Sequence, residues 1–258
     1  MNDSSHPMLY HASPQEIEGG VLIPRLQETC AHWQYKDTPQ EAEHKGDFVF
    51  AGQTLGAAYA YALKLQHPTE TENHLGRERR YDFMLNVGVH KLADDKIVPL
   101  AVISRGEEFE ACLKRAHPTI YKIPNTGQFT PVCFRDGTQS GEWVSRTAVD
   151  TRPLEKIRVS GVDEAMQNGV QIYYLNPKFS KDDWHEMNKN ICDRLVAELG
   201  GEAKMRVPEV SQEFSRSYLQ TMQQCVDNGI LRHINAERGI APFEAPTTPR
   251  AGGFRERV

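Results

Sequence analysis

The hydrophobic positions of the first 177 residues mostly follow the two-residue period of strands. In Arg80–His90, every second residue from Tyr81 to Val89 is apolar, which is typical of a half-buried strand. The compact apolar run Asp47–Ala51 predicts a strand buried on both faces. Similar short runs predict further strands at 8–11, 96–104, 119–123, 129–134, 142–149, 157–160 and 170–175.

Apolar residues at helical spacing are rare before Pro177 and frequent after it. Residues 53–66 repeat apolar positions at helical spacing directly after Thr54, a residue type suited to an N-cap. Short helices are predicted at 107–116 and 162–167, and two long amphipathic helices at 181–199 and 210–234.

These patterns predict an α+β fold with antiparallel sheets, because the strands are not regularly separated by helices as in a doubly wound sheet. The predicted main domain covers 1–177, a helical extension covers 178–240, and the proline-containing segment 241–258 is expected to be a disordered tail. The polar segment 26–46 is expected to be a loop or a lid. Because the apolar stripes of 181–234 must be covered by something, this segment is a candidate surface for a partner or for self-association.

Composition narrows the class of protein. The chain has 258 residues, 39% of them hydrophobic, and a net charge of −5, so nothing in the totals indicates a basic nucleic-acid surface. The five cysteines are widely spaced without a CxxC pair, which argues against a zinc knuckle and fits reduced thiols. No secretory signal is visible at the start, and the longest apolar run, Ala57–Leu63, is too short to span a membrane. We therefore expect a soluble cytoplasmic protein without membrane contact, with export as an effector left open.

Several common catalytic signatures are absent from the sequence. It contains no P-loop, no GxGxxG after a strand and no GxSxG elbow. His185-Glu186 begins like HExxH, but Lys189 stands where the second zinc ligand is needed. No metal site is therefore predicted.

Three short blocks place polar or aromatic groups at strand ends or within strands otherwise suited to burial. They are Tyr10–Ser13, then Phe48–Ala51 with the helix after it, and then Gly141–Ser145. Polar groups in such positions are costly unless they are paired or functional. Taken singly, each also has a structural explanation, such as a satisfied histidine or an edge-strand carboxylate.

In this order the blocks resemble the ADP-ribosyltransferase superfamily, in the branch with a His–Tyr–Glu triad that includes diphtheria toxin and the poly(ADP-ribose) polymerases. The family's first strand ends in His-Gly-Ser/Thr, where this chain has His11-Ala12-Ser13. Its Tyr-Phe-Ala/Ser strand corresponds to Val49-Phe50-Ala51, and its late Glu-Tyr/Trp-Val strand corresponds to Glu142-Trp143-Val144. The resemblance covers roughly residues 8–175 as a pattern, with identities confined to these blocks, and it implies split antiparallel sheets with few helices.

The resemblance implies that NAD is the substrate and that the nicotinamide–ribose bond is cleaved through an oxocarbenium-like state. Glu142 would stabilise the developing positive charge and orient a protein or nucleic-acid acceptor, and His11 would bind a ribose hydroxyl. The remaining expected NAD contacts are the backbone of Ala12 and Ser13 at the nicotinamide amide, Phe50 or Tyr59 stacked on the ring, and Arg25 at the pyrophosphate.

The sequence departs from the family pattern at two positions. Ala12 stands in place of the family's glycine, and Val49 in place of its central tyrosine. These departures keep open a non-catalytic binding module on the same fold. A related RNA 2′-phosphotransferase is a further alternative, although that group carries a histidine at the position of Val49 and needs basic residues around the phosphate.

Overall fold

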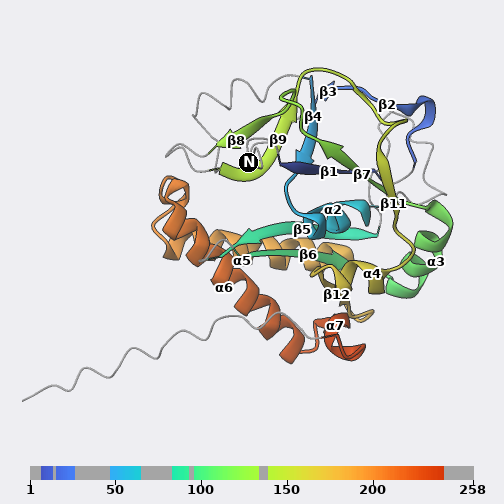
Figure 1. The fold of residues 1–258 in the computed structure, drawn as a ribbon. Helices are drawn as coiled ribbons and strands as arrows, with labels where there is room; N and C mark the ends of the chain where they lie inside the picture. The colour runs from blue at the N-terminus through green and yellow to red at the C-terminus, as the bar shows by residue number, and fades with distance from the viewer. Residues whose placement is uncertain are drawn as a thin grey trace, which may run out of the picture.

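The computed structural model describes residues 7–13, 16–26, 47–64, 83–92, 96–133 and 139–240, and within them two sheets lie one above the other (Figure 1). The first sheet has the order β11-β7-β1-β4-β9-β8, with β3 added beside β4. The second sheet has the order β13-β12-β6-β5, and β10 pairs separately with β2. The strands of the first sheet are β1 (Met8–Ser13), β3 (Arg25–Leu26), β4 (Asp47–Gly52), β7 (Thr119–Pro124), β8 (Thr130–Cys133), β9 (Gln139–Ser145) and β11 (Glu155–Arg158).

The second sheet contains the one parallel pair among the described strands. Its strands are β5 (Met84–Lys91), β6 (Ile97–Ile103), β12 (Gln171–Leu175) and β13 (Leu231–His233). β12 runs parallel to β6, whereas the other pairs of both sheets are antiparallel. The small pair is formed by β2 (Val21–Leu22) and β10 (Val149–Asp150). The predicted α+β class with antiparallel sheets is confirmed at this level.

Helix α2 (Leu55–Ala62) lies between the two sheets. Its sequence LGAAYAYA is rich in alanine, and small side chains let both sheets approach the helix closely. It packs in one cluster with Ile120 of the first sheet and with Ala101 and Ile103 of the second. Thr54 is the N-cap as predicted, since its Oγ1 accepts a hydrogen bond from the Ala57 N–H at 3.4 Å.

The C-terminal helices cover the other face of the second sheet. Helix α5 (Lys181–Glu198) begins with a capping box between Ser180 and Asp183, and α6 (Pro208–Asp227) packs beside it. Both contribute to one cluster with Leu100 and Val102 of β6. Because β13 and α7 (Ile234–Glu237) also pack onto β12, the predicted extension 178–240 shares its core with the preceding domain. The shorter helical elements are η1 (Glu18–Gly20), α3 (Gly106–Ala116), α4 (Val162–Gln167) and η3 (Lys204–Arg206).

Several of the expected elements were wrong in detail, among them the strand predicted over 142–149, which is β9 up to Ser145 and the separate β10 at Val149–Asp150. The helix predicted over 210–234 ends at Asp227, because Gly229 adopts a left-handed φ of 69° and turns the chain into β13. The uniform alternation expected over 80–90 is broken by a register shift between Met84 and Asn86.

The bulge in β5 redistributes its side chains between the two faces. Phe83 and Val87 pack toward α2, whereas Leu85 packs toward α5 and α6.

Most of the predicted 26–46 loop and the predicted tail 241–258 lie outside the described residues. Cys112, Cys192 and Cys225 are free thiols. In the described part of the chain, no helix has both the length and the apolar character needed to cross a membrane.

Candidate functional site

The three blocks singled out in the sequence lie on three neighbouring strands, β1, β4 and β9 (Figure 1). Tyr10 of β1 is paired with Gly52 of β4, and Gly52 is paired with Glu142 of β9. Residues directly opposite each other in a sheet point to the same face. Tyr10 and Glu142 therefore share a face of the first sheet, with Gly52 between them.

His11 fills the gap where β1 and β4 separate. The two strands pair at a single position, Tyr10 with Gly52, and beyond it the His11 Nδ1 lies 2.7 Å from the carbonyl oxygen of Phe50. A carbonyl can only accept, so Nδ1 carries the proton and Nε2 is left as an acceptor. Burial lowers the pKa of His11, against the opposing effect of the Phe50 carbonyl, so the ring is neutral at pH 7.

Glu142 is half-buried and belongs to the face that carries Phe50 and Val144. Phe48 continues this face and lies 4.8 Å from the Arg146 guanidinium, measured to the ring centroid. The alternation of β9 turns Glu142 toward Tyr10, while the His11 ring turns toward the Phe50 carbonyl. The two predicted catalytic residues thus lie two strands apart without a hydrogen bond between them in this arrangement.

The aromatic residues expected to stack on nicotinamide differ in their surroundings. Tyr59 is only 3% exposed, and its hydroxyl donates a hydrogen bond to Glu164 Oε1 at 2.6 Å. Burial and this carboxylate raise the pKa of Tyr59, and the ring is enclosed between α2 and α4. Phe50 is half-buried on the face of Glu142. Val49, at the family's tyrosine position, is buried with Trp143 in the cluster of the opposite face.

The other predicted NAD contacts lie at the edges of this region. Ala12 packs against the cluster around α2, and Ser13 pairs with Thr119 of β7. The backbone of Arg25 pairs with Phe48, but its side chain lies outside the described residues.

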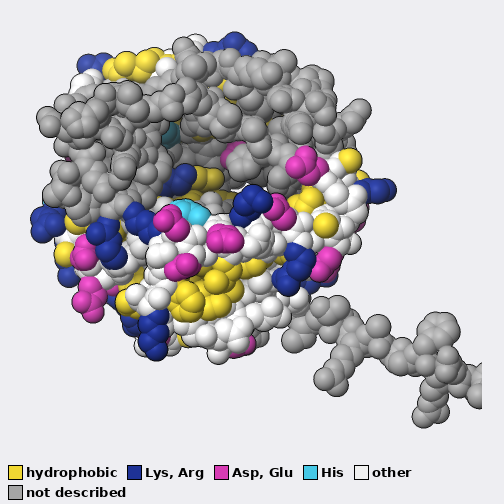
Figure 2. All heavy atoms as spheres, turned by 180° about the vertical axis from the view of Figure 1, so that it is seen from behind, with side chains coloured by type: hydrophobic (Ala, Val, Ile, Leu, Met, Phe, Trp, Pro, Cys, Tyr) yellow, Lys and Arg dark blue, Asp and Glu magenta, His cyan; other side chains and the backbone are white. Residues whose placement is uncertain are grey.

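Gly52 has no close neighbour among the described residues on the face that it shares with Tyr10 and Glu142. A Cβ atom on Gly52 would have no heavy atom of any described residue within 4 Å. On the second sheet, Val87 packs toward α2, so Val89 and Lys91 point to the same side by strand alternation. Val89 is nevertheless 39% exposed, which shows that the described residues leave this part of the inner face uncovered. On the lower part of the view from behind, hydrophobic side chains of described residues gather with acidic and basic side chains around them (Figure 2).

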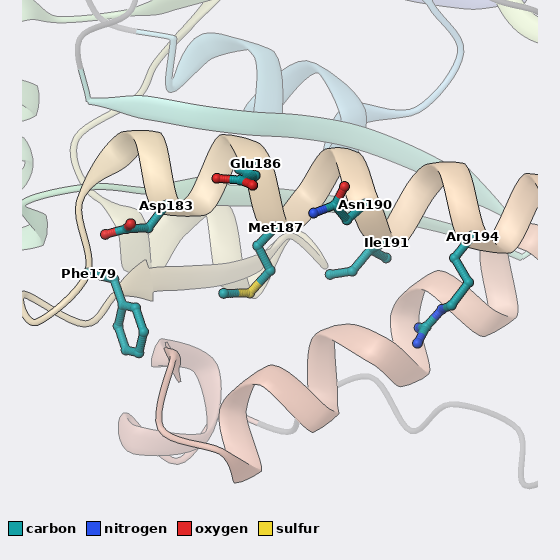
Figure 3. Close-up of a pocket in the computed structure, with 7 residues that line it drawn as sticks. All are labelled: Phe179, Asp183, Glu186, Met187, Asn190, Ile191 and Arg194. Atoms are coloured by element: carbon teal, nitrogen blue, oxygen red, sulfur yellow. The ribbon is translucent and has the colours of Figure 1, made fainter.

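A second concavity, of about 530 Å³, lies against α5 and is lined by none of the motif residues. Met187 and Ile191 form its apolar floor, with Phe179 at one end (Figure 3). Asp183, Glu186 and Arg194 give it charged edges. It lies on the side of the second sheet that α5 and α6 cover, away from the inner face that carries Val89.

Sequence reasoning did not single out Tyr10 and Gly52 as a pair. Tyr10 was part of the first block and Gly52 directly follows the second, but their facing depends on a strand register that connects residues 42 positions apart.

Among the described residues, no cluster of three or more His, Cys, Asp or Glu side chains could hold a metal ion. No protein-family model, curated protein or solved structure matches this chain.

Proposed function

We propose that this protein binds NAD beside β1, β4 and β9 and transfers its ADP-ribose group to a protein or nucleic-acid acceptor, with cleavage of the nicotinamide–ribose bond. The observation that supports it best is the adjacency of the three motif strands. Residues 10–13, 48–52 and 141–145 are far apart in the sequence, and the sheet order places them side by side.

The residues present fit such a ligand. The neutral His11 offers Nε2 as an acceptor for a sugar hydroxyl, because its Nδ1–H is fixed by the Phe50 carbonyl. Glu142 provides a carboxylate beside Gly52, where an added Cβ would meet no atom of a described residue within 4 Å. A carboxylate held there stabilises positive charge that develops on a nearby sugar carbon and orients an incoming hydroxyl. NAD itself supplies a leaving group that departs without a strong general acid.

The direct test is nicotinamide release from NAD by the full-length protein, with and without a cell lysate as the source of acceptor. Glu142→Gln keeps the shape of the side chain but removes its charge, so we expect release to fall by roughly 10²-fold or more. Glu155→Gln is the matched control, because Glu155 is an exposed carboxylate of the same sheet that pairs with Lys122. A requirement for lysate would mark a transferase rather than a hydrolase. Equal release by wild type and Glu142→Gln would contradict the proposed role of Glu142.

A non-catalytic NAD-binding or interaction module is the second candidate. It is favoured by Val49 in place of the family's tyrosine and by the burial of Tyr59, which removes one of the two expected ring contacts. NAD binding without nicotinamide release would support this candidate, and absence of both would reject NAD as the ligand.

A further inference from the structure

A row of side chains along one face of α5 lines the concavity of about 530 Å³. Its members follow one another at intervals of three or four residues, which places them on one face of the helix: Asp183, Met187, Asn190 and Arg194. Figure 3 shows Asp183 and Glu186 toward one end of the row and Arg194 at the other. The row therefore has an acidic end, an apolar middle and a basic end.

Two charges of this row are available to a group from outside the chain. Glu186 is exposed and makes no hydrogen bond or ion pair with a described residue. Arg194 keeps one loose contact with Glu198 at 3.8 Å, and exposed contacts of this kind contribute little to stability. The Asp183 carboxylate, in contrast, is held by the Ser180 cap. Glu186 and Arg194 are thus the charges that a partner can meet.

A helix face with an acid at one end and a base at the other is complementary to an antiparallel copy of itself. About a two-fold axis, residue i contacts residue j of the partner and residue j contacts residue i. Asn190 is the midpoint between Glu186 and Arg194 in the sequence, so an axis at Asn190 places Glu186 opposite the partner's Arg194. Asn190 then faces its own copy, and an amide can both donate and accept a hydrogen bond.

The shape of this surface suits the same arrangement. α5 is a ridge that borders the concavity, so a second, antiparallel α5 can lie in the hollow while its own hollow receives the first. The helix has 18 residues and is about 27 Å long, which allows several turns of contact. Phe179 and Met187 are partly buried apolar side chains beside the row, and methionine adapts readily to an irregular contact.

We infer that this face of α5 is the contact surface for a second copy of the chain, with the two helices antiparallel about a two-fold axis near Asn190. A contact limited to one helix face is small, so self-association is expected in the micromolar range and depends on protein concentration. The inference is independent of the proposed function, because the concavity lies on the side of the second sheet that α5 and α6 cover.

The first test is sedimentation velocity of the full-length protein from about 1 to 300 µM, where wild type is expected to form a dimer. Glu186→Arg and Arg194→Glu each place like charges together at two symmetric positions, and each is expected to weaken the dimer by roughly tenfold or more. The double variant exchanges the signs and is expected to return within about threefold of wild type. Glu209→Arg is the control, because this exposed carboxylate of α6 does not line the concavity.

The second test maps the contact by photo-cross-linking. A benzophenone-bearing phenylalanine replaces Asn190 in a mixture of ordinary and ¹⁵N-labelled full-length chains, and mass spectrometry identifies the products. Cross-links between the two isotopes are expected within Lys181–Glu198. The same group in place of His185 is the control, because His185 lies about 140° around the helix from Asn190 and should give no such product.

Each outcome supports or overturns the inference. A protein that stays monomeric over the whole concentration range would overturn it, as would a dimer that both single charge reversals leave unchanged. Cross-links confined to one chain, for example to its residues 241–258, would give the concavity another occupant and also overturn it. Thermal unfolding checks that the reversal variants fold, and cross-linking of the otherwise unchanged chain decides the question if they do not.

Discussion

His90 is a half-buried histidine whose protonation opposes folding. Its ring stacks on Tyr218 with centroids 4.9 Å apart, and the Tyr218 hydroxyl donates to Asn188 at 2.6 Å and accepts from Asn86 at 2.7 Å. Burial lowers the pKa of His90 to about 4. The folded pKa lies below the ordinary value of 6.5, so stability is complete above pH 6.5 and is lost as the pH falls toward 4.

The expected loss from His90 alone is of the order of 3 kcal/mol between pH 7 and pH 4. His90→Phe keeps a stacked ring that cannot be protonated, so urea unfolding of this variant should depend less on pH over this range than that of wild type. Burial also lowers the pKa values of His11 and His233, which add a slope of the same sign to both proteins. His185→Gln, at an exposed position of α5, is the control and should keep the wild-type slope. Identical slopes in wild type and His90→Phe would reject this assignment.

Helix α3 is flanked by two non-glycine residues in the left-handed conformation, Arg105 with φ 49° and His117 with φ 52°. This conformation costs an L-residue about 1 kcal/mol, and glycine adopts it without the penalty. His117 is exposed at the C-terminal end of the helix, so His117→Gly should raise the stability by about 0.5–1 kcal/mol. The gain is measured as the midpoint of urea unfolding, with His117→Ala as the control that keeps the steric cost. A glycine variant less stable than the alanine variant would contradict the expectation.

Elements with strong local signals were predictable, whereas those fixed by distant contacts were not. Helix α4 matches its predicted bounds 162–167, and α5 begins at the predicted Lys181 after the Ser180 cap. The short strands β3 and β13 carry too little pattern in two or three residues to be recognised alone. The end of α6 was missed because the apolar residues Ile230, Leu231 and Ile234 continue past Gly229, although Leu231 lies in β13 and Ile234 begins α7.

The same distinction holds for the candidate site. The motif blocks were visible in the sequence because each is local, and the sheet order brings them together. Which side chains share a face is set by register between strands, and a shift by one residue exchanges the two faces. The facing of Tyr10, Gly52 and Glu142 was therefore not predictable from the motifs, because it depends on pairing between residues of three separate strands.

Two of the apolar clusters lie on either side of the second sheet, and the C-terminal helices belong to one of them. Strand β13 and the side chain of Asn235 tie the chain end to β12, since Asn235 accepts from the Ile172 N–H at 2.8 Å and donates to the Val170 carbonyl at 2.9 Å. Residues 178–240 therefore cannot leave without exposing the second sheet. We expect the described parts to unfold in one cooperative transition.

Substitutions of Trp184 test whether the described parts unfold in one cooperative transition. This tryptophan is fully buried in α5 within the cluster that includes Leu100 and Val102 of β6. Trp184→Ala should cost about 3–5 kcal/mol and lower the single melting temperature by of the order of 10 °C. Trp184→Phe should cost much less, because it keeps most of the packing and removes an indole N–H that has no partner among the described residues. Calorimetry and circular dichroism distinguish the alternatives: if Trp184→Ala instead produced an early transition for the helices and left a later one unchanged, the extension would fold as a separate unit.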